Sequence, residues 1–260
     1  MSKSIQLKIE NKVATITLNR PEVFNSFNRE MAFLLQNTLD ACEKNDEVRA
    51  IVLTGNGKAF CAGQDLKEVT DPDLNPGFKK ILEEHYNPII TRIRAFKKPV
   101  IAAVNGVAAG AGANIALACD VIVAHEKVSF IQAFSLIGLV PDSAGTFFLP
   151  RLIGFQKALA LAMLGDKISA EEAEKMGMIY KCVSFEVFDE TINKLALKMA
   201  NMPTKALGLI KELYNKSMTN DLESQLALES KLQIEAASTE DYAEGVSAFI
   251  QKRKPEFKGK

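Results

Sequence analysis

The stretch that most constrains the fold is residues 100–119, VIAAVNGVAAGAGANIALAC, in which no side chain is charged. A membrane span needs roughly 20 strongly apolar residues, and Gly106 and Gly110 have the GxxxG spacing of packed membrane helices. This run, however, is mostly Ala and Gly, includes two asparagines and is followed directly by Asp120. The pattern therefore favours a buried strand, a tight turn and a helix over a membrane span.

A second turn of the same kind lies at residues 60–65, FCAGQD. The predicted strand AIVLTG ends at Gly55, and a short connecting segment leads from it into this turn. The predicted strand VIAAVN leads directly into GVAAGAG at 106–112. Small residues let a ligand approach the main chain closely, and the second turn opens a helix whose free N–H groups favour negative charge. Two such turns side by side could each direct one N–H at the same oxygen, which defines an oxyanion hole.

Two other interpretations fit the glycines of these turns. Each turn taken alone is equally consistent with glycines that only allow tight packing of a strand against a helix. Gly110 and Gly112 also resemble the start of a dinucleotide-binding GxGxxG motif, but position 115 is Ile and the turn lies in the middle of the chain.

The hydrophobic pattern alternates between strand and helix signals, which predicts an α/β fold with largely parallel pairing. The predicted strands are 4–10 and 13–18, as a hairpin around Asn11-Lys12, then 50–55, 100–105 and 121–124. The predicted helices are 28–43, 79–96, 204–216, 221–237 and 239–252, with a loop at 70–78. Ser169 and Glu172 have the spacing of a capping box at the start of another helix.

Composition excludes several classes of function. Lys plus Arg and Asp plus Glu balance at 32 each, so no nucleic-acid partner is expected. The four cysteines form no CxxC pair and there are two histidines, so we expect no metal site, and free thiols in a reducing compartment. The N-terminal MSKSIQLKIENK lacks the apolar core of a signal peptide, which favours a cytoplasmic location.

Several segments together resemble the enoyl-CoA hydratase/isomerase family, also called the crotonase family. The matching segments are ITLNRPEVFNSFN at 16–28, KAFCAGQDLKE at 58–68, KPVIAAVNGVAAGAGANIALACD at 98–120, IGLVPDSAGTFFLPRLIG at 137–154 and EGVSAFIQKRKPEFKG at 244–259. The resemblance covers essentially the whole chain. It implies a crotonase (ClpP-like) spiral of ββα units at 1–200 and a helical trimerisation region at 201–260, assembled as a homotrimer or homohexamer.

The resemblance further implies an acyl-CoA thioester as the substrate, with coenzyme A as part of that substrate and no separate cofactor. Family members hold the thioester carbonyl between two backbone N–H groups, which fall here at Gln64 and Ala111. The residues implied in substrate and CoA binding are Phe24, Ala62, Asp65, Leu66, Lys67, Gly110, Phe249 and Lys252. Phe249 and Lys252 resemble a C-terminal pair that reaches CoA, sometimes from an adjacent subunit.

The family's hydratases use two glutamates, and the corresponding positions here are Asn114 and Phe134. Neither side chain exchanges a proton as a carboxylate does, so two-glutamate hydration is not expected. An acid stands instead at Asp142, in LVPDSAGT, which resembles the isomerase branches that use one carboxylate. The implied activity is an acyl-CoA isomerase with Asp142 as acid and base. The amino-acid sequence most resembles isomerases of phenylacetate degradation, which convert ring-1,2-epoxyphenylacetyl-CoA to oxepin-CoA.

The apolar neighbours of Asp142 in the sequence predict a raised pKa for its carboxyl group; they are Phe134, Leu139, Val140 and Phe147. A different interpretation makes Asp142 the N-cap of the helix that follows. Two further functions stay open: a straight-chain enoyl-CoA isomerase or hydratase, and a non-catalytic acyl-CoA-binding subunit.

Other polar residues are also open to two interpretations. Four side chains could line the acyl pocket or belong to a solvated, packed helix: Glu83, Glu84, His85 and Tyr86. Asp120 is expected to make a structural hydrogen bond.

Overall fold

The larger of two sheets contains six strands in the order β1-β2-β3-β5-β7-β10. In the computed structural model, which describes residues 3–260, these strands are Ile5–Glu10, Val13–Leu18, Ala50–Gly55, Val100–Val104, Val121–His125 and Lys181–Val183. β1 and β2 form the predicted antiparallel hairpin, whose turn residues Asn11 and Lys12 both have positive φ. The later pairings in this sheet are parallel, so the α/β prediction is confirmed.

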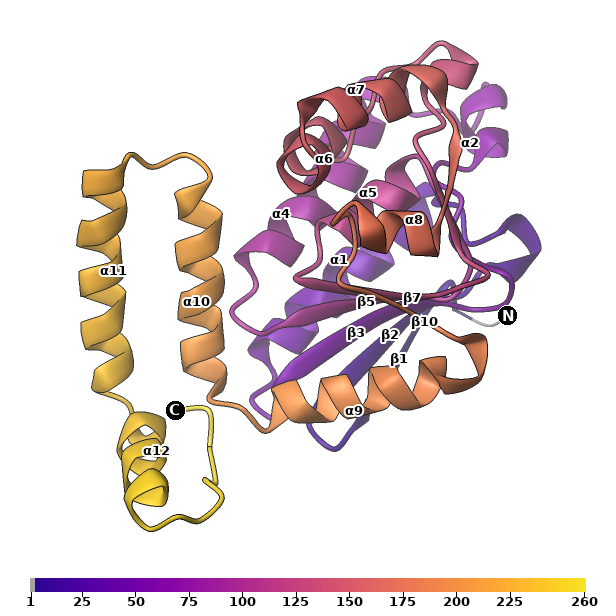
Figure 1. The fold of residues 1–260 in the computed structure, drawn as a ribbon. Coiled ribbons are helices and arrows are strands. Elements are labelled where there is room, and N and C mark those ends of the chain that lie inside the picture. The colour runs from indigo at the N-terminus through magenta and orange to yellow at the C-terminus, as the bar shows by residue number, and fades with distance from the viewer. Residues whose placement is uncertain (1–2) are drawn as a thin grey trace.

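The central strands of this sheet are buried on both faces, whereas the edge strand β1 is mostly exposed; alternate residues of each strand face opposite layers. The helices that pack against it include α9 (Phe188–Ala200) on one side and α1 (Arg29–Lys44), α4 (Asn87–Ala95) and α5 (Ala111–Leu117) on the other. In β3, Val52 packs toward α9, while Ile51 and Leu53 belong to the main core. Figure 1 shows α9 beneath the sheet and the other three helices above it.

The second sheet has the order β4-β6-β8-β9, with strands Ala59–Cys61, Val107–Ala109, Ser129–Ile131 and Lys167–Ser169. β4 overlaps the start of segment 60–65, and β6 lies within segment 106–112. The two strands pair in parallel, which brings the turns that follow them side by side. Strand 100–105 runs directly into segment 106–112 as expected, but the first part of that segment, Val107–Ala109, is strand β6 and not a turn. Strands of three residues are too short to show a period in the sequence, and the second sheet had no other signal.

The predicted helix at 79–96 is three consecutive pieces: α3 (Phe78–Lys80), a π-helical segment η2 (Ile81–Tyr86) and α4. Pro88 accounts for the change, because it has no N–H to offer the carbonyl of Glu84 one turn earlier. Gln36 of α1 satisfies that carbonyl, donating from Nε2 to Glu84 O at 2.7 Å and to His85 O at 3.3 Å. The π-helical segment is thus stabilised by a buried side chain of its neighbour.

The C-terminal section consists of α10 (Thr204–Ser217), α11 (Leu222–Ala237) and α12 (Glu240–Ile250), close to the predicted bounds. Figure 1 shows α10 and α11 side by side, projecting from the sheets. Buried Arg49, just before β3, connects this section to the core: it donates to Thr204 Oγ1 at 2.8 Å and to the carbonyl of Phe257 at 2.7 Å.

Shorter elements complete the chain: η1 (Pro21–Val23), α2 (Leu66–Thr70), η3 (Ser135–Ile137), α6 (Gly145–Ile153), α7 (Phe155–Leu164), α8 (Ala170–Lys175) and η4 (Phe185–Val187). The predicted capping box at Ser169 and Glu172 begins α8. Asp120 is structural, as expected, because its Oδ2 accepts bonds of 2.8 Å from Val100 N and from Lys211 Nζ.

The uncharged stretch 100–119 forms β5, β6 and α5, which confirms the strand–turn–helix interpretation. Across residues 3–260, no helix has the length and apolar character that a membrane crossing requires. The four cysteines carry free thiols, as predicted.

Candidate active site

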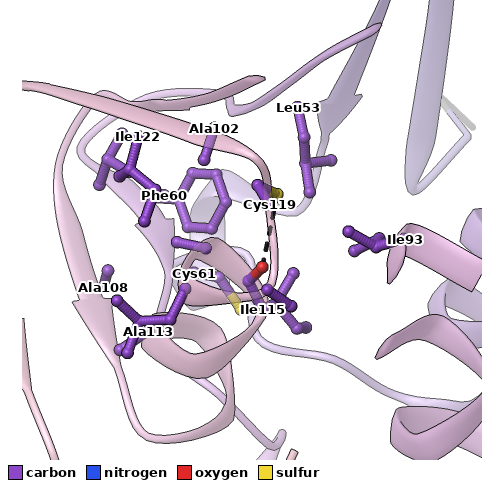
Figure 2. Packing of buried hydrophobic residues seen from close by; sticks show 14 of the residues in the cluster. Leu53, Phe60, Cys61, Ile93, Ala102, Ala108, Ala113, Ile115, Cys119 and Ile122 are labelled. Carbon is purple, nitrogen blue, oxygen red and sulfur yellow. Dashed lines mark hydrogen bonds between the residues drawn. The ribbon is translucent and has the colours of Figure 1, made fainter. Parts of the chain in front are cut away.

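The two small-residue turns are in van der Waals contact above the apolar core. A Cβ on Gly63 would lie 3.1 Å from the carbonyl oxygen of Ala109 and 3.5 Å from the nitrogen of Ala111. In the second turn, a Cβ on Gly112 would lie 2.3 Å from the carbonyl oxygen of Cys61 in the first turn, so only glycine fits there. Figure 2 shows Phe60 and Cys61 beside Ala108, Ala113 and Ile115, the apolar layer on which both turns rest. The glycines therefore serve close packing of the two turns.

The N–H of Gln64 faces away from the strand-like segment at Phe27. Phe27 donates to the carbonyl of Gly63 at 2.7 Å and accepts from Asp65 N at 2.8 Å, a one-residue parallel bridge. Because a trans peptide places C=O and N–H on opposite sides, the Gln64 N–H in the same peptide as the Gly63 carbonyl points the other way. The second turn packs against Gly63, the residue just before this N–H.

The N–H of Ala111 is the first of helix α5, and the first N–H groups of a helix have no partner within it. Gly110 before it has φ +52°, and its own N–H donates to the carbonyl of Ile131. The ring of buried Phe134 would be 3.7 Å from a Cβ on Gly110, so it covers this turn. Two backbone donors from adjacent turns are thus available to an acceptor oxygen.

Asp142 lies in the loop before α6 and is not the N-cap of that helix. Ser143 and Ala144 both have positive φ, which delays the helix until Gly145, and Ala144 is the capping residue. The Asp142 side chain instead accepts a 2.8 Å bond from Ser143 Oγ. Gly145, the first residue of α6, packs against Asn114, and a Cβ there would lie 2.3 Å from the amide nitrogen.

Burial raises the pKa of the Asp142 carboxyl above its ordinary value of 3.8, and the bond from Ser143 only partly opposes this. The direction matches the prediction, although two of the four side chains expected to surround the group are themselves exposed. Leu139 is partly exposed and Val140 is 80% exposed. A carboxyl group with a raised pKa exchanges protons more readily near neutral pH than a solvated one.

This pKa shift makes a stability prediction. Because the folded pKa is raised, folding disfavours the charged form, so the stability cost is absent below 3.8 and appears as pH rises through the folded pKa. We therefore expect Asp142→Asn to raise the free energy of unfolding at neutral pH and to leave it unchanged at strongly acid pH. Thermal unfolding of both proteins across this range measures the difference. A wild type that is more stable than the variant at neutral pH would contradict the assignment.

Asn114 supports the main chain at Asp142. Its Nδ2 donates to the Asp142 carbonyl at 2.8 Å, and its Oδ1 accepts from Gln132 Nε2 at 2.9 Å. Asn114 and Gln132 are both buried, and Gln132 Oε1 has no partner among the described residues. An apolar pocket of about 100 Å³ adjoins this network and is lined by residues that include Gln132, Pro141, Gly145, Leu149 and Phe155. Asn114 therefore has a structural role where the resemblance would place a glutamate.

Four of the residues predicted to bind the substrate are exposed near the first turn: Phe24, Ala62, Leu66 and Lys67. Ala62 N donates to the carbonyl of Phe24 at 3.0 Å, so the two segments adjoin. Asp65, by contrast, is buried, and its carboxylate is engaged by Arg20 at 2.8 Å and by Lys67 N at 3.0 Å. Asp65 caps α2 and orders this loop.

The structure does not bring Phe249 and Lys252 to the turns. Phe249 is 86% exposed near the end of α12, and Lys252 follows that helix. Figure 1 places α12 at the base of the projecting C-terminal section, far from α2 and α5.

The four polar residues at 83–86, which the sequence left open to two interpretations, differ in their exposure. Glu83 is exposed and Glu84 pairs with Arg29 at 2.8 Å, which supports the surface interpretation for both. His85 and Tyr86 are fully buried. Tyr86 donates to the side chain of Gln64, a link between distant segments that sequence reasoning missed and that no local signal indicated. Within residues 3–260 no cluster of side chains has the composition of a metal site.

The fold and these two turns define the class of protein. The family model described as Enoyl-CoA hydratase/isomerase matches residues 8–260, and the chain belongs to that family. The crystal structure of an enoyl-CoA hydratase from Bacillus anthracis superposes with a TM-score of 0.92 at 34% identity, covering 99% of this chain and 100% of the other. The predicted crotonase-type fold with a helical C-terminal section is therefore confirmed, and the protein is an enzyme of this family.

Two curated relatives narrow the comparison. The 1,2-epoxyphenylacetyl-CoA isomerase of Escherichia coli K12 is 47% identical, with 100% of both chains covered. The trans-2-decenoyl-[acyl-carrier-protein] isomerase of Streptococcus mutans is 37% identical, with 99% of both chains covered. The chain is thus similar to isomerases as well as to hydratases.

Proposed function

We propose that the protein is an acyl-CoA isomerase in which Asp142 alone removes and returns the proton. One observation carries this proposal: Asp142 is a carboxyl group with a burial-raised pKa, while the two positions of the hydratase glutamates hold Asn114 and Phe134. Asn114 is committed to the Asp142 carbonyl, and Phe134 covers Gly110. Neither residue offers the second carboxylate that addition of water by the two-glutamate route needs.

The two turns would supply the electrostatic part of the reaction. The N–H groups of Gln64 and Ala111 donate to the thioester oxygen, which becomes negative when a proton leaves the neighbouring carbon. Asp142 accepts that proton as a carboxylate and returns it at another position as a carboxylic acid. The product then has the composition of the substrate, and Asp142 ends in the form in which it began.

The best substrate is ring-1,2-epoxyphenylacetyl-CoA, with oxepin-CoA as product, because the relative at 47% identity carries that activity in its name. Asp142 would assist opening of the epoxide and the rearrangement of the ring. The second candidate is a straight-chain enoyl-CoA isomerase, which the relative named for decenoyl isomerisation favours. A non-catalytic acyl-CoA-binding subunit is the remaining possibility.

One experiment separates these functions. Purified protein is incubated with the epoxide thioester, a 3-enoyl-CoA and crotonyl-CoA, and the products are separated by chromatography and weighed by mass spectrometry. Isomerisation changes retention without a change in mass, whereas hydration of crotonyl-CoA adds one water. Turnover of the epoxide thioester above the 3-enoyl-CoA supports the proposal, the reverse order supports the second candidate, and no product from any of the three contradicts an enzymatic isomerase.

The pH dependence of the reaction is a further prediction. Asp142 must be ionised to accept a proton, so kcat/KM should fall as the pH drops through its raised pKa. The acid limb of the profile is therefore expected above 3.8, the ordinary value for an aspartate. Measuring kcat/KM from neutral to acid pH tests this. A profile whose acid limb lies at or below that ordinary value would exclude Asp142 as the base.

The wider setting is also proposed from the family resemblance. We infer a cytoplasmic homotrimer or homohexamer, with a core at 1–200 and an assembly region at 201–260. Phe249 and Lys252 lie on the projecting C-terminal section, so they would reach CoA bound at the turns of a neighbouring subunit. Coenzyme A is part of the substrate, and the proposed chemistry uses no other cofactor.

A further inference from the structure

Gln64 is held through its side chain as well as through its main chain. Its Oε1 accepts a 3.0 Å bond from the hydroxyl of Tyr86, and its Nε2 donates a 2.7 Å bond to Glu68 Oε2. The main chain on either side is bonded to Phe27. A residue whose backbone N–H is proposed to bind the substrate is thus fixed from three directions.

The orientation of the Gln64 amide follows from the acceptors around it. Glu68 accepts with both oxygens, one from Gln64 and the other from Arg29 N at 2.7 Å. A carboxylate has no proton to donate, so the amide nitrogen must face Glu68 and the amide oxygen must face Tyr86. The Tyr86 proton is therefore committed to Gln64.

Tyr86 is placed rigidly enough to act as an anchor. It is fully buried, and its ring lies 5.9 Å from that of Phe27, the residue that bridges Gln64. It is the last residue of η2, the π-helical segment that Pro88 and Gln36 stabilise. Single π turns within helices occur frequently at functional sites. Burial raises the pKa of the phenol well above its ordinary value, so the hydroxyl keeps its proton.

Gln64 needs such an anchor because of the residue before it. Gly63 has φ +95° and no Cβ, so its own conformational preferences restrict the rotation of the Gly63–Gln64 peptide little. The bond from Phe27 N to the Gly63 carbonyl orients this peptide at one end. The bond from Tyr86 to the Gln64 side chain orients it at the other. Because hydrogen bonds aimed at a developing charge act through fixed geometry, a small rotation here changes the stabilisation they give.

We propose that Tyr86 is a positioning residue, which acts through the Gln64 side chain to hold the Gln64 N–H toward the thioester oxygen. This inference rests on the proposed function, in which that N–H binds the substrate. Tyr86 itself does not exchange a proton in the reaction. The hydroxyl makes one neutral hydrogen bond to Gln64, so its loss should cost about tenfold or less in kcat.

The test replaces the two ends of the link separately. Tyr86→Phe removes only the hydroxyl, and Gln64→Leu removes the acceptor but keeps the backbone N–H. Each should lower kcat by about five- to tenfold with KM within about twofold. The double variant should be no slower than Gln64→Leu alone, because both changes remove the same bond. Tyr180→Phe, at an exposed tyrosine, is the matched control and should match the wild type.

Infrared spectroscopy supplies a measurement that a purely structural role would not affect. A saturated acyl-CoA labelled with ¹³C at its carbonyl binds without reacting, and two donors on the oxygen lower its carbonyl stretching frequency. In Tyr86→Phe this frequency should return part of the way toward its value in solution. An unchanged frequency in a folded variant, or additive effects in the double variant, would overturn the positioning role.

The spectroscopic arm does not require turnover, so it also separates this inference from the proposed reaction. Suppose that the carbonyl frequency shifts on binding to the wild type, that the shift is smaller in Tyr86→Phe, and that the protein isomerises none of the three substrates. This result would support the positioning role and reject the proposed reaction. No shift in the wild type rejects both. Thermal unfolding of each variant confirms that the comparison is made between folded proteins.

Discussion

Replacing Asp142 with Asn should lower kcat by about three orders of magnitude, while the Kd for a saturated acyl-CoA stays within a few fold. General acid–base catalysis contributes roughly 10²- to 10⁴-fold, and in the proposed mechanism one carboxylate carries both proton transfers, so a loss in the middle of that range is expected. Asn has nearly the same shape and keeps the oxygen that accepts from Ser143 Oγ. The loop should therefore stay in place, and only the exchangeable proton is lost.

The control for this variant is Glu83→Gln, which changes an exposed carboxylate that the sequence alone left as a candidate. It should retain essentially full activity. Steady-state rates and calorimetric binding of a saturated thioester measure the two quantities separately. If the kcat of Asp142→Asn is within about tenfold of the wild-type value, the single-carboxylate mechanism is wrong. Loss of binding together with turnover would instead indicate that the loop had moved.

The stability of the same variant strengthens the argument, because the two effects have opposite signs. A half-buried carboxylate whose pKa is raised by desolvation costs stability at neutral pH, so Asp142→Asn should unfold at higher temperature while it loses activity. A residue retained for folding shows the reverse pattern. Asp120 illustrates this case, because its carboxylate is satisfied by the backbone at Val100 and by Lys211.

Long elements could be predicted from the sequence because their hydrophobic period is visible over several turns or residues. The helix predicted at 28–43 is α1, Arg29–Lys44, and the strand ending at Gly55 is β3. The second sheet could not be predicted, since its strands have three residues each and are defined by pairing between distant segments. These short strands bring the two turns together, so the pairing of Gln64 with Ala111 could be assigned only from the family resemblance.

The failures near the site have a common physical cause, which is tertiary contact overriding local chemistry. Pro-Asp-Ser before an apolar run favours a cap at Asp142, yet Gly145 packs against Asn114 and the cap lies two residues later, at Ala144. The helix at 79–96 contains a π turn because a buried glutamine on another helix satisfies the carbonyl that Pro88 leaves free. Neither partner is near in sequence, so neither outcome could be read from the local segment.

The second large effect is expected at Gly63, where the two turns touch. Its φ of +95° is unfavourable for any residue with a Cβ, and that Cβ would lie 3.1 Å from Ala109 O and 3.5 Å from Ala111 N. Gly63→Ala should therefore push the turns apart and rotate the peptide that carries the Gln64 N–H. Loss of one aligned donor to a developing oxyanion typically costs about 10²- to 10³-fold, and we expect a fall in kcat of that size.

Backbone strain alone would also lower stability, by about 1–3 kcal/mol, so the prediction needs a control with the same strain and no contact. Gly154 provides it, because its φ is +82° and a Cβ there would meet nothing within 4 Å. Gly154→Ala should lose a similar amount of stability and keep its rate per folded molecule. Gly63→Ala should lose both, and the infrared shift of a bound thioester should shrink with the rate. If the two alanine variants turn over equally well, the contact between the turns does not organise the site, and the backbone-donor proposal for Gln64 and Ala111 is wrong.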